Sequence, residues 1–297
     1  MLQRFPIKTI SAILIASFCF LHFGVPRLIT QIRFPLQSKE VSPPSNYEFT
    51  PFTYQTFDQL TIAGSLFSSP HIPPRGSIIL LHGIRSRKEH LYPMANKIAV
   101  SGYNVFVIDL RAHGDSEGTY CTFGAKEKQD IKALVDCIHA NFGLHEPIGI
   151  LGQSLGGAIA LQALAEDKRI SYGVIESTFS DFKTVASDYI TRITGIENEF
   201  FKNYLINRSA NIADFDIDLV IPSKSCTKID QNVLLVHGKN DKRIALKHYL
   251  ENSRSFQFNN CKTKLIDNAN HLNVWQVGGA TYFNEVMSFL DEYTQLK

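Results

Sequence analysis

The sequence has little net charge of either sign. Its 297 residues carry 30 Lys or Arg against 28 Asp or Glu, and both signs are spread along the chain. A nucleic-acid-binding surface needs a basic stripe or patch, so this balance argues against a nucleic-acid partner.

The five cysteines contain no Cys-x-x-Cys pair, which argues against a thiolate zinc site. Cys226 and Cys261 can meet in an oxidising compartment, but isolated thiols are the favoured prediction.

One apolar run stands at the N-terminus. Residues Thr9 to Val25 carry no formal charge, with Arg4 and Lys8 before the run and Arg27 after it. About 17 residues is short for a bilayer span and long for the core of a signal peptide. Because no small-x-small cleavage site follows, we expect residues 1–30 to form an uncleaved membrane anchor, with a cleaved secretory signal as the alternative. The flanking charges are balanced, and we expect the folded domain to lie outside the cytoplasm.

Residues 31–48 are predicted to form a spacer, since Pro43 and Pro44 block helix and strand alike. Residues 49–297 are predicted to form one α/β domain that begins with an antiparallel hairpin at a sheet edge. Six nearly all-apolar runs follow, typical of parallel strands covered on both faces: 78–81, 105–108, 148–151, 173–175, 233–236 and 263–266. Helical patterns alternate with these runs, at 89–101, 126–142, 155–167, 246–252 and 281–296. The aromatic-rich interval 178–228 has helical spacing but no strand run, which predicts an inserted helical cap.

A glycine-flanked serine follows the third run. In Gly152-Gln153-Ser154-Leu155-Gly156 the chain turns from a predicted strand into a small-residue helix. Such a turn exposes a nucleophilic hydroxyl and needs glycine where the two chain segments approach closely. The positive end of the helix dipole favours negative charge that develops there. We therefore predict Ser154 as a nucleophile, against the alternative of a glycine-rich turn with an incidental serine.

A serine nucleophile needs a base to take its proton and an acid to orient that base. His271 follows the last apolar run and Asp241 follows the run before it. Both therefore fall at carboxyl ends of strands, where reactive groups of open α/β sheets gather. We predict His271 as the base and Asp241 as the acid. Glu176, after the fourth run, is the leading alternative acid, and Asp267 is a less favoured one.

The loop after the first apolar run is predicted to stabilise an oxyanion. The backbone N–H groups of Ile84 and of Leu155 are the expected donors of the oxyanion hole. His82 is expected to pack beneath the site rather than to act in it. The basic loop 85–88 can receive a carboxylate or phosphate, but a solvated loop is the favoured interpretation.

The charged segment Asp109 to Gly118 follows the second apolar run. We interpret it as a structural turn that holds neighbouring loops through hydrogen bonds, with His113 as a minor catalytic alternative. Its carboxylate spacing matches no calcium loop. Neither a metal nor a cofactor is therefore expected.

Five motifs, taken together and in this order, resemble the α/β-hydrolase superfamily. They are His82-Gly83, Asp109-x-Arg111-x-His113-Gly114-x-Ser116-x-Gly118, Gly152-x-Ser154-x-Gly156, His237-Gly238-x-x-Asp241 and His271. The resemblance runs from about Gln55 to the C-terminus. It is strongest to membrane-anchored serine hydrolases related to monoacylglycerol lipases and to alpha/beta hydrolase domain proteins. It implies the α/β-hydrolase fold, a mostly parallel eight-stranded sheet flanked by helices, with a small helical cap between the sixth and seventh strands. Serine rather than aspartate at position 154 argues against a dehalogenase or an epoxide hydrolase.

The expected activity is therefore that of a serine hydrolase that cleaves carboxylic esters or thioesters. An aromatic-rich cap beside a membrane anchor suits a small-molecule or lipid substrate with an acyl chain, because each buried methylene contributes about 0.8 kcal/mol. A serine peptidase or amidase with the same triad is the alternative. An inactive hydrolase-like binding protein is less favoured, since that interpretation requires a missing triad member and none is missing.

Overall fold

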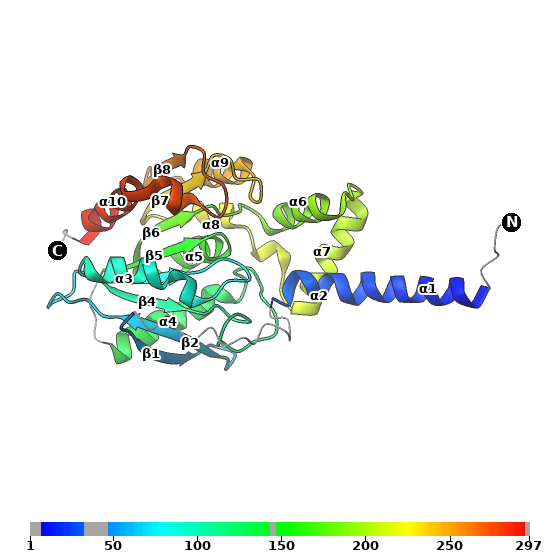
Figure 1. The fold of residues 1–297 in the computed structure, drawn as a ribbon, viewed down its shortest axis with the longest axis horizontal. Coiled ribbons are helices and arrows are strands. Elements are labelled where there is room, and N and C mark those ends of the chain that lie inside the picture. Colours follow the sequence, from blue (N-terminus) through cyan, green and yellow to red (C-terminus); the bar gives the residue numbers. More distant parts are fainter. Residues whose placement is uncertain (1–6, 33–46, 143–146, 295–297) are drawn as a thin grey trace.

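The structure, a computed structural model, describes residues 7–32, 47–142 and 147–294, and most of the predicted spacer lies outside these residues. Eight strands form one sheet with helices on both faces (Figure 1). The strands are β1 (Thr50–Gln55), β2 (Thr61–Phe67), β3 (Ser77–Leu81), β4 (Asn104–Ile108), β5 (Ile148–Gln153), β6 (Ile170–Glu176), β7 (Asn232–Gly238) and β8 (Cys261–Ile266). The helices are α1 (Ile7–Cys19), α2 (Val25–Thr30), α3 (Tyr92–Val100), α4 (Glu127–Asn141), α5 (Leu155–Glu166), α6 (Phe182–Thr194), α7 (Glu199–Ala213), α8 (Pro222–Cys226), α9 (Leu246–Ser255) and α10 (Val274–Thr294). Short turns of 3₁₀ helix are η2 (Lys88–Leu91) and η3 (Ile217–Leu219), and a π-helical turn is η1 (Phe20–Gly24).

The sheet has the order β1-β2-β4-β3-β5-β6-β7-β8. Strands β1 and β2 form the antiparallel hairpin predicted at a sheet edge, with Thr50 opposite Leu66. The pair β2–β4 is also antiparallel, and all pairs from β4 to β8 are parallel. The six apolar runs lie in β3 to β8, one run in each strand. The predicted α/β-hydrolase architecture, with its mostly parallel eight-stranded sheet, is therefore confirmed.

Each central strand is buried on both of its faces. In β3, Ile79 and Leu81 face the cluster formed with α4, α5 and α9, whereas Ile78 and Leu80 face the cluster formed with α3 and α10. Successive side chains of a strand point to opposite faces, so a strand between two helical layers is apolar at every position. This is the physical origin of the uninterrupted apolar runs.

Helix α10 extends further toward the N-terminus than the predicted helix over 281–296, because a first helical segment precedes it. It begins at Val274 and is kinked at Gly279, whose backbone has φ 54°. Glycine tolerates this left-handed conformation, which other residues adopt only at a cost. The Gly278-Gly279 pair therefore divides α10 into two helical segments, and the predicted helix from residue 281 lies in the second of them.

The interval between β6 and β7 contains helices and no strand in the structure. Its helix α6 starts where the Asp181 side chain accepts the N–H of Thr184, and ends at Gly195 with φ 70°. A ring cluster of Phe123, Phe182 and Phe215 joins the start of α6 to the core, with the first two ring centroids 4.2 Å apart. Helices α6 and α7 project from the layered body (Figure 1). Helix α8 instead packs against α5 and α9.

The five cysteines are free thiols. Cys226 is buried and Cys261 is partly buried, and burial raises the pKa of both thiols. No disulfide joins these two residues, although Cys261 lies close enough to Cys226 to raise the pKa of that thiol further.

The N-terminal residues form a helical rod that leaves the body of the protein (Figure 1). The 20 residues Ser11–Thr30 contain an 18-residue stretch with a mean hydropathy of 1.8, and they are long and apolar enough to cross a membrane by length and composition. An anchor and a signal sequence share these properties. The inner part of the rod, α2, packs against α7.

Candidate active site

Ser154 lies at the turn between β5 and α5. Its backbone has φ 55° and ψ −115°, a conformation that is costly for any residue other than glycine. A Cβ added to Gly152 would lie 2.2 Å from the carbonyl oxygen of Gly156, and one added to Gly156 would lie 2.4 Å from that of Leu81. The two glycines of the motif are therefore required by close backbone approach, as the sequence predicted.

Hydrogen bonds from β6 and the residues after it hold this turn. The Ser154 N–H donates to the carbonyl oxygen of Glu176 at 2.8 Å. The buried hydroxyl of Thr178 donates to the carbonyl oxygen of Ser154, also at 2.8 Å. Sequence reasoning missed Thr178, although it follows the carboxyl end of β6, where its position could have suggested a role.

His271 connects the serine to a carboxylate. Its Nδ1 lies 2.7 Å from Asp241 Oδ2, and its Nε2 lies 3.0 Å from Ser154 Oγ. Because an ionised carboxylate only accepts hydrogen bonds, the imidazole proton is assigned to Nδ1. Nε2 is then free to accept the proton of the serine hydroxyl. The structure brings together the three side chains that the sequence selected, from the ends of β5, β7 and β8.

Asp241 is held in its ionised form. Burial acts to raise the pKa of its carboxyl, but His271 and the backbone N–H groups of Ile244 and Arg243 together outweigh burial, and the net pKa is lowered. Its other oxygen, Oδ1, accepts the backbone N–H groups of Arg243 at 2.8 Å and Ile244 at 2.9 Å. The buried ring of His237 donates from Nε2 to the carbonyl oxygen of Ile244 at 2.9 Å, which fixes the same loop.

Glu176, the alternative acid, faces a different part of the interior. Its carboxylate accepts hydrogen bonds from Tyr282 Oη and from Gln153 Nε2, each at 3.0 Å. Burial raises the pKa of Glu176 to about 7, against the lowering effect of these two donors. Among the described residues, no hydrogen bond or ion pair joins Glu176 to His271, whose two ring nitrogens are bonded to Asp241 and Ser154.

The remaining acid and histidine alternatives lie in other environments. Asp267 is exposed and pairs with Lys239. His82 is buried, donates from Nδ1 to the carbonyl oxygen of Gly83 at 2.7 Å and accepts the N–H of Leu110 at Nε2. Burial lowers the pKa of His82 to about 4 and that of His113 to about 3, so both rings are neutral near pH 7.

The charged turn after β4 holds the loop after β3. Asp109 accepts hydrogen bonds from the backbone N–H of Lys88, from Lys88 Nζ and from the N–H of Asp115. Lys88 Nζ also pairs with Glu89 and Asp115, so one ammonium group lies among three carboxylates. Lys88 is therefore a buried ion-pair partner, and for this residue the favoured interpretation of a solvated basic loop was wrong.

The loop that carries Ile84 lies against the serine turn. A Cβ added to Gly83 would be 3.4 Å from Ser154 Cβ and 3.7 Å from the carbonyl oxygen of Gln153. Helix α5 starts at Leu155, so its first N–H groups point back toward the serine. The side chains of Ile84 and Leu272, the neighbour of His271, are exposed. The loops that carry Gly83 and His271 thus each expose an apolar side chain.

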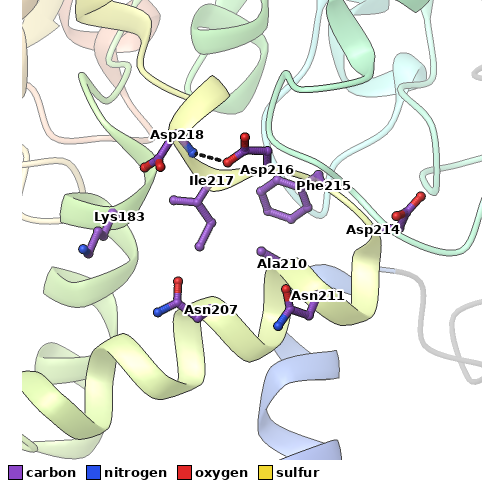
Figure 2. Close-up of a pocket in the computed structure, with 9 residues that line it drawn as sticks. All are labelled: Lys183, Asn207, Ala210, Asn211, Asp214, Phe215, Asp216, Ile217 and Asp218. Carbon is purple, nitrogen blue, oxygen red and sulfur yellow. Dashed lines mark hydrogen bonds between the residues drawn. The ribbon is translucent and has the colours of Figure 1, made fainter.

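A separate pocket of about 560 Å³ lies in the interval between β6 and β7 (Figure 2). Helices α6 and α7 and the segment after α7 form its walls. Its lining residues are Lys183, Asn207, Ala210, Asn211, Asp214, Phe215, Asp216, Ile217 and Asp218. The lining includes three carboxylates and none of the residues of the Ser154 cluster, and it is poorly suited to an acyl chain.

Comparison with known proteins agrees with this architecture. The family model described as "Serine aminopeptidase, S33" matches residues 72–216. The esterase Pf2001 of Pyrococcus furiosus superposes with a TM-score of 0.69 at 24% identity, over 84% of this chain and 93% of that one. The chain has the α/β-hydrolase fold, and residues 72–216 match a family of serine hydrolases. It is thus an enzyme of the serine-hydrolase type.

Two curated proteins illustrate the breadth of this similarity. The uncharacterised protein YfhR of Escherichia coli is 24% identical over 253 residues, which cover 83% of this chain and 80% of that protein. The thiohydrolase aneE of Aspergillus aculeatus is 31% identical over 137 residues, which cover 43% of this chain and 42% of aneE.

Proposed function

We propose that this enzyme hydrolyses carboxylic esters or thioesters of acyl or lipid-type substrates, with Ser154, His271 and Asp241 as its catalytic triad. The observation that carries the proposal is the continuous hydrogen-bonded line from Ser154 Oγ to His271 at 3.0 Å and from His271 to Asp241 at 2.7 Å. This geometry is that of a nucleophile, a general base and an orienting acid.

In the first half of the reaction, Ser154 Oγ attacks the acyl carbonyl carbon and its proton passes to His271 Nε2. Ionised Asp241 stabilises the imidazolium that forms and keeps its ring oriented. The backbone N–H groups of Ile84 and Leu155 are proposed to donate to the developing oxyanion. When the tetrahedral intermediate collapses, His271 gives the proton to the leaving alcohol or thiol, and the acyl group stays on Ser154.

In the second half, water replaces the departed alcohol or thiol. The water attacks the acyl-serine ester while His271 Nε2 takes a proton from it. The N–H groups of Ile84 and Leu155 donate hydrogen bonds to the second oxyanion. Collapse returns the proton to Ser154 Oγ and releases the carboxylic acid. This reaction uses the acyl chain only for binding, so specificity depends on the surroundings of the serine.

Three observations support an acyl substrate. The apolar side chains of Ile84, next to Gly83, and of Leu272, next to His271, are exposed. The names of two similar proteins, an esterase and a thiohydrolase, describe acyl transfer to water from oxygen or sulfur. The apolar N-terminal helix would hold the enzyme where acyl lipids are abundant.

A serine peptidase or amidase is the second candidate. It is favoured by the description of the matching family, a serine aminopeptidase, and by the fact that the same triad can cleave amides.

We further propose that residues 1–30 stay attached as a membrane anchor with the enzyme domain outside the cytoplasm; a cleaved signal is the alternative. Residues 178–228 are proposed to form the cap that selects the substrate.

The nucleophile is tested by labelling the full chain with a fluorophosphonate probe. We expect labelling of the native enzyme and none of Ser154→Ala. Ser86→Ala is a matched control, because Ser86 Oγ also contacts a histidine, His90 Nδ1 at 2.9 Å. Unchanged labelling of Ser154→Ala, or no labelling of folded native enzyme, contradicts the proposed nucleophile.

The substrate class is tested with nitrophenyl esters and thioesters of rising chain length, against aminoacyl amides. We expect kcat/KM to rise with chain length, since each buried methylene adds about 0.8 kcal/mol, close to fourfold. A preference for acetyl esters, with a falling rate beyond about four carbons, counts against an acyl-lipid substrate. Faster cleavage of the amides would favour the peptidase.

A further inference from the structure

The N-terminal helix is fastened to α7 by side chains that lie in one row. The row consists of Tyr204, whose hydroxyl is hydrogen-bonded to His22 Nδ1, and Arg208, whose Nε donates to the carbonyl oxygen of His22 at 3.4 Å. The Arg208 guanidinium also lies over the Phe23 ring, 5.5 Å from its centroid. The two helices therefore meet at the level of His22.

After His22 the N-terminal helix packs against the enzyme domain. Arg85 Nη2 donates to the carbonyl oxygen of Leu28 at 3.0 Å, and the N–H of Cys121 donates to that of Thr30 at 2.9 Å. Pro26 and Thr30 are buried. Residues 22–30 thus contact protein along one side, with Phe23 and Leu28 exposed on the other, and only before His22 is the helix open to lipid on every side.

That free part is too short to cross a bilayer alone. The uncharged stretch Thr9–Leu21 has about 13 residues, which at about 1.5 Å per residue extend roughly 20 Å. The hydrocarbon core of a bilayer is about 30 Å thick. If the N-terminal helix spans the bilayer, the segment near His22 must lie at the membrane surface. The part of the protein that packs beside this segment must then lie there too.

The part of the protein that packs there has an apolar end. Phe200 lies one turn before Tyr204, so it extends the same row on α7 toward the α6–α7 corner. Its side chain is 85% exposed, and that of Ile193 on the other side of the corner is 73% exposed. On the N-terminal helix, Phe18 stacks on His22 and is 60% exposed. The corner projects on the side toward which α1 leaves the body (Figure 1).

We propose that the α6–α7 corner, with Phe200 and Ile193, is embedded in the interfacial layer of the bilayer that α1 enters. This inference rests on the proposed anchor. The exposed carboxylate residues Glu197 and Glu199 lie between the two apolar side chains and cannot enter the hydrocarbon core without a large cost. The corner therefore lies at the boundary of headgroups and acyl chains, where apolar side chains are buried and charges remain hydrated.

The test uses fluorescence, because the chain has a single tryptophan. In the full chain with Trp275→Phe, Phe200→Trp places a reporter at the corner. Phe258→Trp is the matched control, an equal change at a 56% exposed phenylalanine that precedes β8, whereas His271 follows the other end of that strand. Both proteins are reconstituted into phosphatidylcholine vesicles, with and without bromine on the acyl chains, after their probe labelling has shown that they are folded.

We expect the emission of the Phe200→Trp protein to shift to the blue on vesicles and to lose intensity on brominated lipid, while the control shows neither change. Vesicle-bound protein with no quenching at position 200, or with equal quenching at both positions, overturns the corner contact and leaves the anchor intact. Failure of the native full chain to remain with vesicles after an alkaline wash overturns the anchor and this inference together. Probe labelling, and with it the proposed hydrolase activity, does not depend on either result.

Discussion

The ends of β6 and β7 present two carboxylates in adjacent positions of one sheet, and their chemistry differs. Asp241, after β7, accepts a proton-bearing ring nitrogen and two backbone N–H groups, and its pKa is lowered. Glu176, at the end of β6, accepts one hydroxyl and one amide group in a fully buried position, and burial raises its pKa to about 7. Both carboxylates lie at the carboxyl end of a strand. Their charge therefore depends on the hydrogen-bond donors and the burial around each of them.

This difference assigns separate tasks to the two acids. An ionised Asp241 can stabilise an imidazolium, which a neutral acid cannot do. Glu176 instead connects Tyr282 of α10 to Gln153, the residue before the serine. We interpret it as part of the interior that supports the turn. The following substitutions test that division.

The largest effect is expected for Asp241→Asn. The amide lacks the negative charge and favours the wrong imidazole tautomer, so we expect kcat to fall by about 10⁴-fold. The measurement is kcat on a nitrophenyl ester, with circular dichroism to establish folding. Turnover that survives in this variant but is lost in Glu176→Gln would reject the assignment of Asp241.

A smaller effect, on stability, is expected for Tyr282→Phe. Loss of the hydroxyl removes one of two donors to a buried carboxyl, which typically costs about 1–3 kcal/mol. Thermal unfolding of the full chain in detergent measures this loss. Tyr293→Phe is the matched control, because its hydroxyl contacts Glu292 in an exposed position, and a change below about 0.5 kcal/mol is expected. Equal destabilisation by both changes would contradict a supporting role for Glu176.

The smallest effect on turnover is expected for Glu176→Gln, within about tenfold of the native rate since the amide keeps the shape of the neutral acid. The charge state of Glu176 is tested separately by the pH dependence of the free energy of unfolding. The pKa of Glu176 rises from 4.5 to about 7 on folding, so its contribution to stability is complete below pH 4.5 and is lost as pH rises toward 7. The Gln variant should lack this component between pH 4.5 and 7. An identical profile for both proteins would show that Glu176 is ionised in the native state.

The features that could be predicted from the sequence are those that leave a pattern in consecutive residues. Apolar runs located six strands, and the residues after three of them identified Ser154, Asp241 and His271. The same rule could not choose between Asp241 and Glu176, because the donors to each come from distant segments such as Tyr282. Burial of Lys88 was missed for the same reason, since its three carboxylate partners meet only in the fold. The docking of the N-terminal helix on α7 joins residues 182 positions apart and leaves no local pattern.

The order in which the three residues occur along the chain also affects how the enzyme is made. Ser154 and His271 are 117 positions apart, and His271 is the last of the three to be synthesised. At about 5–20 residues per second, translation adds the histidine roughly ten seconds after the serine. By then the N-terminal helix has long left the ribosome. With the proposed triad and anchor, the nascent chain carries an unactivated serine while the helix is inserted, and the enzyme becomes competent only once it is at the membrane.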